Sequence, residues 1–259
     1  MIRFSELGTA GRLGNQMWQI AGTIGIAHAR GDRPTFPDWD YRPYFQVPDT
    51  YFSDQPGIEA RTLVPHMDER CALYLQDYGL FADITPVVRA VFRPSPLATQ
   101  EMRVPKYDWF WELGGPVALH VRRGDMLTEP DGYHPLTTTA YYERALDLVG
   151  RPVVVFSDDL PWCRETFGHF DDMYFFEGSP SRVPDYDPGY AESSPTDWLD
   201  LQFMAACSDH IIANSTYSWW GAFLAGNPHP IYPLTWFGSK LRYIDWKLQI
   251  PPGWRGIEC

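Results

Sequence analysis

The stretch PVALHVRRGDM, residues 116–126, decides how the fold is interpreted. Its apolar part has the length and composition of a buried strand, and it ends in a cluster of polar residues: His120, Arg122, Arg123 and Asp125. Successive strand residues point to opposite faces, so one arginine can face a ligand while the other holds Asp125 or the loop. A guanidinium at a strand end suits a phosphate oxygen, which predicts an anion site. A surface arginine in a structural salt bridge is the alternative.

Working outward, strands and helices alternate from this stretch to the end of the chain. Strands are predicted in VALHV, RPVVVFSDD, DMYFFEG, HIIAN and, as the last one, HPIYP. The helices between them are TTTAYYERALDLVG, PWCRETF, SPTDWLDLQFMAACSD and STYSWWGAFLAG. This alternation predicts a parallel, doubly wound sheet. We therefore expect residues 111–259 to form a Rossmann-like domain.

Residues 1–110 predict a second, smaller α/β domain. It begins as strand, glycine loop and helix, with Asn15 as the N-cap and Gly31 as the C-terminal stop. Residues 34–51 have the composition of a loop. A short strand is expected in RCALYLQDYG and a short helix in TPVVRAVFRP, and SPLATQEMRVPKYDWFWELGGP is expected to have little regular structure.

Composition limits the classes of partner. The formal charge of −12 argues against nucleic acid or an anionic membrane as the main partner. The 44% of hydrophobic residues suffice for a sizeable core, and the four cysteines lack metal-site or disulfide spacing. No apolar run approaches the ~20 residues of a membrane span, and the N-terminus lacks a signal-peptide pattern. A soluble, cytoplasmic protein is expected.

Two further polar strings follow predicted strands. In FSDD, Asp159 fits the N-cap of the next helix, while Asp158 is freer to accept hydrogen bonds from a ribose or a base. In NSTYS, the residues Ser215, Thr216 and Ser218 open a helix, where hydroxyls and backbone N–H groups can bind an anion or serve as ordinary caps. Ligands of open α/β sheets bind beyond the carboxyl ends of the strands. The coincidence of three polar strand ends therefore predicts one site.

Other motifs are weaker. Two aspartate pairs match the DxD string with which metal-dependent glycosyltransferases hold Mn²⁺ or Mg²⁺: Asp38 with Asp40, and Asp185 with Asp187. Both lie in proline-rich loops, which favours solvated side chains. The glycine-rich GTAGRLGNQ has neither dinucleotide-fingerprint nor P-loop spacing and indicates only a tight turn. The NST triplet at Asn214 matches a glycosylation sequon, but its apolar context argues against modification.

The strings GRLGNQM, HVRRGD, HPLTTTAYYERAL, VVFSDDLPWCRETF and DLQFMAACSDHIIANSTYSWWGAFL, taken in order, resemble the α1,2-fucosyltransferases of glycosyltransferase family 11, the bacterial members above all. The resemblance implies a GT-B-like α/β fold of two Rossmann-like domains, GDP-fucose as donor, inversion at the anomeric carbon, and no metal or other cofactor. The acceptor it implies is a terminal galactose, through O2, of an oligosaccharide or lipid-linked glycan. Peripheral membrane association is compatible with the latter.

The resemblance also implies roles for single residues. The donor-binding set is Gly14, Asn15, Arg122, Asp158, Ser215, Thr216 and Ser218. The catalytic set is His120, Arg122, Asp125, Glu129 and Asp131. In these sets Arg122 holds the β-phosphate, Asp158 reads the guanosine, and the general base is left open among the last three carboxylates of the catalytic set.

Alternatives stay open at this point. One is a transferase for another nucleotide sugar, of the GDP-mannose or rhamnose type or a UDP-sugar with a metal on a DxD pair. Another is a non-catalytic module that binds a nucleotide or a glycan. Met126 stands where an aromatic residue commonly follows RRGD in the family, and residues 34–56 and 94–116 have unusual composition. These differences leave the acceptor open.

Overall fold

The computed structural model describes residues 1–128, 132–150, 152–178, 196–227 and 229–259. This part of the chain forms two compact units. The first comprises Met1–Gln100 and the C-terminal segment Ile244–Pro251, and the second comprises the other described residues from Glu101 onward. Each unit contains a parallel sheet, which confirms the predicted α/β class. The helices within the described residues are all too short or too polar to cross a bilayer.

The second unit contains a sheet of six parallel strands. Its order is β6-β5-β4-β7-β8-β9. The strands are β4 (Val117–Val121), β5 (Val153–Ser157), β6 (Met173–Phe175), β7 (Asp209–Ile211), β8 (Ile231–Pro233) and β9 (Arg255–Ile257). Numbered within the unit, this is the 3-2-1-4-5-6 order of dinucleotide-binding domains. The direction of winding therefore reverses between β4 and β7.

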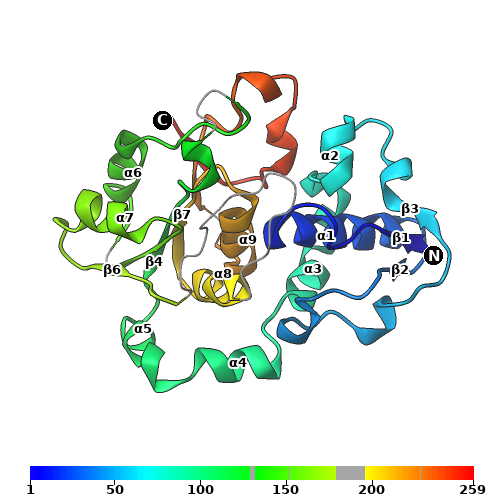
Figure 1. The fold of residues 1–259 in the computed structure, drawn as a ribbon, viewed down its shortest axis with the longest axis horizontal. Helices are drawn as coiled ribbons and strands as arrows, with labels where there is room; N and C mark the ends of the chain where they lie inside the picture. The colour runs from blue at the N-terminus through cyan, green and yellow to red at the C-terminus, as the bar shows by residue number, and fades with distance from the viewer. Residues whose placement is uncertain (129–131, 151, 179–195, 228) are drawn as a thin grey trace. The chain divides into compact units, whose positions relative to one another are not determined.

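Helices cover both faces of this sheet (Figure 1). The helices are α6 (Thr139–Leu146) and α7 (Leu160–Phe167) on one face, and α8 (Asp197–Ala205) and α9 (Thr216–Ala225) on the other. Strand alternation assigns the faces, because Val117, Leu119 and Val121 of β4 join the cluster of buried residues formed with α6 and α7. The predicted doubly wound sheet and its four predicted helices are confirmed.

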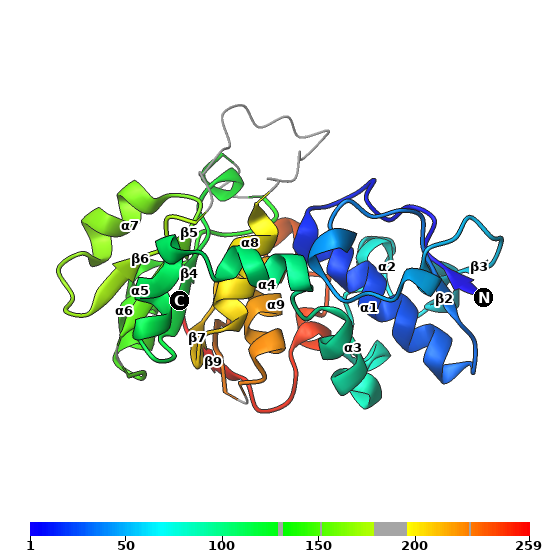
Figure 2. The same cartoon turned by 90° about the horizontal axis from the view of Figure 1, so that it is seen from below.

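The first unit contains a small sheet of order β2-β1-β3, with β1 (Ile2–Arg3), β2 (Pro34–Thr35) and β3 (Ile58–Glu59). Helix α1 (Leu13–Ala29) lies along these strands (Figure 2) and is buried over most of its length. The predicted stop at Gly31 is confirmed: its φ is +63°, and its N–H donates to the His28 carbonyl. The short helix expected near residue 85 is α3 (Thr85–Val91).

Several sequence-based predictions are wrong. The strand expected in RCALYLQDYG is instead a helix, α2 (Glu69–Tyr74), because a short apolar run does not distinguish the two. The segment expected to be irregular contains α4 (Pro96–Met102) and α5 (Asp108–Glu112), which are too short to show a helical period. The expected loop after residue 33 begins with β2.

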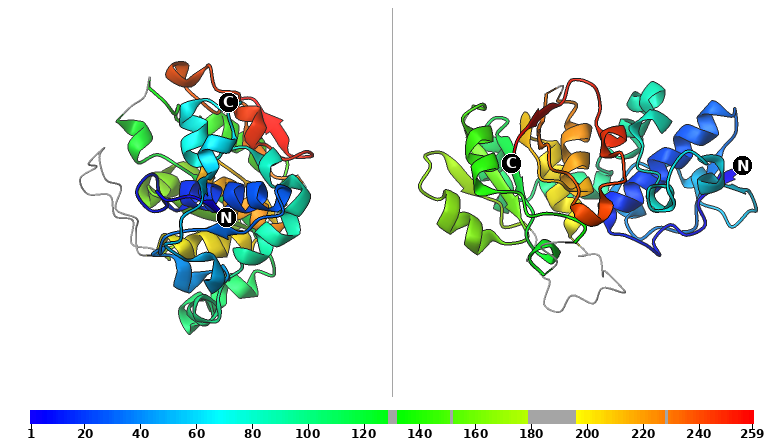
Figure 3. Two further views of the ribbon diagram at one scale, coloured as in Figure 1. Left: turned by 90° about the vertical axis from the view of Figure 1, so that its right-hand side faces the viewer. Right: turned by 90° about the horizontal axis from the view of Figure 1, so that it is seen from above.

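Two further corrections concern the ends of elements. The strand β8 is not the last one, because β9 pairs with it through backbone groups near the C-terminus (Figure 3, right-hand view). Helix α1 begins at Leu13 with Arg12 as its N-cap and no side-chain cap. Asn15 is therefore a residue of the first turn and not the N-cap.

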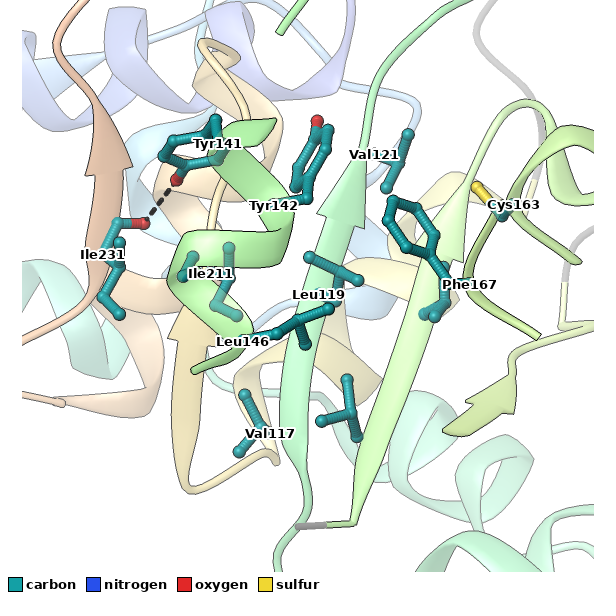
Figure 4. Packing of buried hydrophobic residues seen from close by; sticks show 13 residues of the cluster. Val117, Leu119, Val121, Tyr141, Tyr142, Leu146, Cys163, Phe167, Ile211 and Ile231 are labelled. Atoms are coloured by element: carbon teal, nitrogen blue, oxygen red, sulfur yellow. Dashed lines mark hydrogen bonds between the residues drawn. The ribbon is translucent and has the colours of Figure 1, made fainter. Parts of the chain in front are cut away.

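Tyr141 joins α6 to two strands inside the core of the second unit (Figure 4). Its ring is fully buried, and its hydroxyl donates to the carbonyl of Ile212 at 2.7 Å and to that of Ile231 at 3.1 Å. The two acceptors thus lie just after the end of β7 and at the start of β8. A buried phenol with two carbonyl acceptors fixes the height of α6 over the sheet.

The substitution Tyr141→Phe is expected to lower the free energy of unfolding by about 1–2 kcal/mol, because it removes a buried donor from two carbonyls. Urea unfolding of both proteins measures the difference. Tyr243→Phe is the matched control, since Tyr243 is 66% exposed. Equal loss in the two variants would contradict a role for the Tyr141 hydroxyl.

Candidate functional site

The ladder between β4 and β5 continues past both strands as two ion pairs. The register runs from Val117 opposite Val153 to Val121 opposite Ser157, so the next positions place Arg122 opposite Asp158 and Arg123 opposite Asp159. Nη1 of Arg122 lies 2.9 Å from Oδ2 of Asp158. Nε of Arg123 lies 2.9 Å from Oδ2 of Asp159. Two charged pairs therefore cross between the carboxyl ends of neighbouring strands.

Arg123 belongs to the face covered by α7. Its guanidinium lies over the Trp162 ring, with the Cζ atom 3.9 Å from the ring centroid. Asp159, its ion-pair partner, also accepts a hydrogen bond from the backbone N–H of Trp162 at 3.2 Å. It therefore caps α7, as predicted. Arg123 is therefore held on the structural side of the sheet.

Arg122 belongs to the opposite face, the one it shares with His120 and α9. It donates to Oδ1 of Asp125 through Nη2 at 2.6 Å and Nε at 3.1 Å. We expected the arginine that turns away from the ligand to hold Asp125 or the loop; in the structure Arg122 holds Asp125, and Arg123 pairs with Asp159. The turn through Gly124 brings Asp125 back onto Arg122 itself, three residues earlier.

Asp158 was expected to be freer for a ligand than the structure shows. Its Oδ1 accepts a hydrogen bond from the Arg123 backbone N–H at 2.8 Å, and its Oδ2 forms the ion pair with Arg122. The carboxylate is thus engaged with the loop after β4 on both oxygens.

His120 lies just inside the same strand end and is 5% exposed. Burial lowers its pKa to about 4; the Asp158 charge acts against this shift and Arg122 adds to it. The imidazole is therefore neutral at pH 7. Its ring packs 5.6 Å from that of Tyr217, in the first turn of α9.

The NSTYS string shows three different roles. Asn214 is 2% exposed, and its amide donates to the Pro135 and Trp236 carbonyls, so it is no glycosylation acceptor in the folded protein. Ser215 caps α9 by accepting from the Tyr217 N–H. Ser218 is 1% exposed, and its hydroxyl donates back to the Ala213 and Ser215 carbonyls. The hydrogen of its hydroxyl is thus shared with the backbone, and Thr216 is the first residue of the helix. Contact of either residue with a donor stays a prediction.

Gly14 and Asn15 lie in the first unit, in the first turn of α1. The Asn15 side chain accepts a hydrogen bond from Nε2 of Gln76 at 2.9 Å, and Gln76 in turn accepts one from Gln249 at 3.2 Å. This chain of amides fixes the Asn15 carbonyl oxygen. Contact of these residues with a donor stays a prediction.

Of the remaining candidate carboxylates, two lie in the described part of the chain and four do not. Asp38, with 89% of its side chain exposed, pairs with Arg42, and Asp40 is exposed too, as a solvated loop predicts. Glu129, Asp131, Asp185 and Asp187 lie outside the described residues. Within the described ranges, no three His, Cys, Asp or Glu side chains form a group that could hold a metal ion.

The contacts of Arg122, His120 and Ser215 lie around the point where the winding of the sheet reverses. His120 lies in β4 and Arg122 follows its last residue, while Ser215 and the N-terminus of α9 follow β7, the neighbouring strand. Open α/β sheets bind phosphate-bearing ligands at this point, where a helix N-terminus and a cationic side chain meet. Fold and site together define a doubly wound α/β protein with an arginine and a helix N-terminus at its switch point, an arrangement typical of phosphate binding.

Comparison with known proteins names the family. The sequence profile described as "Glycosyl transferase family 11" matches residues 101–258, more than half of the chain. The chain belongs to this family, which confirms the family predicted from the motifs. The match does not extend to Gly14 and Asn15 of the first unit.

Three curated relatives are similar in sequence. The chain is 36% identical over 148 residues to the O-antigen biosynthesis glycosyltransferase WbnK of Escherichia coli, covering 52% of this chain and 45% of WbnK. It is 35% identical over 159 residues to an alpha-1,2-colitosyltransferase of Escherichia coli, covering 55% and 47%. It is 32% identical over 117 residues to galactoside alpha-(1,2)-fucosyltransferase 1 of Saimiri sciureus, covering 42% and 29%. The aligned part spans less than half the length of each relative.

Sequence reasoning missed the residues that support the site. Tyr217 and Trp162 were interpreted as helix residues only, although each follows a polar strand end by a few positions and packs on a residue of HVRR. The available signal was the equal spacing of VRR and SDD after strands of equal length. Aligning those strands would have paired the arginines with the aspartates.

Asp200 of α8 is a further titratable group next to this region. Burial and the nearby Asp197 charge raise its pKa to about 8, against the effect of Lys106. Its Oδ1 is enclosed and has no hydrogen-bond partner among the described residues. The backbone carbonyl of Asp197 accepts the hydroxyl of Tyr217, the residue that packs on His120. The start of α8 is thus linked to the site.

The contribution of Asp200 to the free energy of unfolding is expected to fall as pH rises from about 4 to about 8, because folded Asp200 keeps a proton that the unfolded chain releases over this range. Asp200→Asn should remove this part of the pH dependence and stabilise the protein most at pH 8. Urea unfolding between pH 5 and pH 8 measures it, with the exposed Asp171→Asn as control. Parallel pH profiles for wild type and Asp200→Asn would contradict the assignment.

Proposed function

We propose that this protein is an inverting glycosyltransferase that moves L-fucose from GDP-fucose to a hydroxyl of a glycan, O2 of a terminal galactose in the simplest case, without a metal ion. The observation that carries the proposal is Arg122, fixed at the switch point of the sheet on the face of α9. Membership of glycosyl transferase family 11 and similarity to a galactoside alpha-(1,2)-fucosyltransferase support the reaction class.

The proposed chemistry centres on the leaving group. Fucose transfer breaks the bond between the anomeric carbon and the diphosphate, so negative charge grows on the β-phosphate oxygens. A guanidinium held in place before the donor binds can stabilise that charge without reorganisation. The N-terminus of α9 adds the positive end of a helix dipole. His120, neutral at pH 7, contributes a ring nitrogen and no charge.

Inversion by direct attack calls for a group that accepts the acceptor's hydroxyl proton. Asp125 accepts two N–H groups of Arg122 and is assigned to holding that arginine. We therefore assign the general base to Glu129 or Asp131. Exchange of each for the matching amide, with Asp125→Asn for comparison, tests which carboxylate takes the proton.

One observation supports colitose as an alternative to fucose in the donor: the similarity to an alpha-1,2-colitosyltransferase. A colitosyl donor would present the same GDP moiety to Arg122 and differ only in the sugar. Turnover measured with GDP-fucose, GDP-colitose, GDP-mannose and UDP-galactose, each with a galactose-terminated acceptor, decides between them. Product linkage by NMR then tests the α1,2 assignment. Binding of GDP without any transfer would instead support a non-catalytic nucleotide-binding module.

Arg122→Ala is expected to lower turnover at least a hundredfold, since loss of one preorganised donor costs about 3 kcal/mol in the transition state. Steady-state kinetics with GDP-fucose and circular dichroism measure turnover and folding. Arg164→Ala is the control, because Arg164 is half exposed and pairs only with Glu177 and the Phe175 ring among the contacts described. A folded Arg122→Ala protein with near-normal turnover would refute the proposed mechanism.

Chelation gives an independent test. If a guanidinium neutralises the diphosphate, turnover should stay within about twofold after treatment with EDTA, and added Mn²⁺ or Mg²⁺ should change it little. A loss of activity that Mn²⁺ restores would favour a metal-dependent enzyme that uses a DxD pair. The assay uses the same donor and acceptor with and without chelator.

A further inference from the structure

We propose that Asp158 acts through Arg122. In this view it is a positioning residue for the guanidinium that binds the donor's diphosphate, and it does not read the guanosine. The inference rests on the proposed function and deepens it. It also replaces the role that family resemblance implies for this residue.

Both oxygens of Asp158 are directed at the loop after β4. Oδ1 accepts the Arg123 N–H at 2.8 Å, and Oδ2 lies 2.9 Å from Nη1 of Arg122. The side chain is 16% exposed. A carboxylate that hydrogen bonds to a base or ribose needs an oxygen turned to the ligand, whereas this one is turned to protein donors on both sides.

Gly124 closes the third side of the Asp158 carboxylate. A Cβ atom at residue 124 would lie 2.6 Å from Oδ2, the same oxygen that pairs with Arg122. Only a residue without a side chain allows this approach. The turn is therefore shaped around the carboxylate of Asp158, as expected for a group whose task is to hold the loop.

Asp125 and Asp158 hold Arg122 from two edges of its planar group. Asp125 accepts from Nε and Nη2, while Asp158 faces Nη1. A guanidinium with fixed partners on two edges cannot rotate about its last bonds. Nη1 carries two hydrogens, so it can face Asp158 and still donate to a phosphate oxygen.

The test compares two probes, GDP and guanosine, which share the base and ribose and differ in the diphosphate. Asp158→Asn keeps the size of the side chain and removes its charge. By calorimetry or ligand-observed NMR, GDP affinity should fall about tenfold or more, while guanosine affinity should change less than twofold. An equal loss for both probes would mean that Asp158 contacts the nucleoside, and the inference would be overturned.

A double-mutant cycle supplies the second readout. In the Arg122→Ala background, Asp158→Asn should change GDP affinity and turnover less than twofold, since the residue it positions is already absent. Independent, additive effects of the two substitutions would contradict the positioning role. A merely structural role would also lower guanosine binding and thermal stability in both backgrounds.

Gly124→Ala is the variant that leaves every charge in place. It should displace Oδ2 from Arg122 and reproduce the selective loss of GDP affinity. Gly124→Ala also keeps the inference testable if Asp158→Asn does not fold. Asp171→Asn is the control for Asp158→Asn, because it removes the charge of one exposed aspartate. Normal GDP affinity in folded Gly124→Ala would overturn the inference. Wild type without GDP affinity would instead overturn the proposed function itself.

Discussion

The two ion pairs that extend the β4–β5 ladder are the constraint on which the rest of the site depends. They join residues 36 positions apart that the strand register places opposite one another. Strand alternation then gives each pair its own face: Arg123 and Asp159 hold α7, while Arg122 and Asp158 face α9. One adjacent pair of arginines thereby serves the packing of α7 on one face and the candidate site on the other.

This division of labour explains why an acidic chain keeps two consecutive arginines at a strand end. The chain carries 33 acidic and 21 basic side chains, so no long-range field favours an anionic ligand. Locally, each arginine has a carboxylate partner, and the partners are themselves fixed by the cap of α7 and the turn at Gly124. Attraction for an anion at this site is therefore short-range and directional.

Much of the second unit could be predicted from its sequence, because most of its strands are apolar runs followed by polar residues and the helices α6, α7 and α9 each begin at a capping side chain. The first unit could not. Its strands have two residues each, and its only long helix is buried almost all round, so neither shows a clear periodicity. The predictions for residues 70–79 in this unit, and for residues 95–116, most of which lie in the second unit, were wrong because the helices there are too short to show a helical period.

The site residues were predicted as types and places, but their pairing was not. Spacing located Arg122, Asp125 and Asp158 at strand ends, yet it could not show that both carboxylates engage the same guanidinium. That fact depends on strand register and on a backbone turn whose shape requires Gly124. Strand register is set by packing over the whole sheet, so local sequence patterns do not predict it.

Under the proposed function, two carboxylates beside a phosphate-binding arginine present an electrostatic conflict. They repel the diphosphate that the arginine attracts, so their presence weakens binding in the ground state. They also fix a side chain whose rotamer freedom is worth about 2 kcal/mol, and they do so before the donor arrives. Charge on the leaving β-phosphate grows only as the glycosidic bond breaks. A rigid guanidinium therefore gains most where that charge is greatest, and the balance favours the transition state over the bound donor.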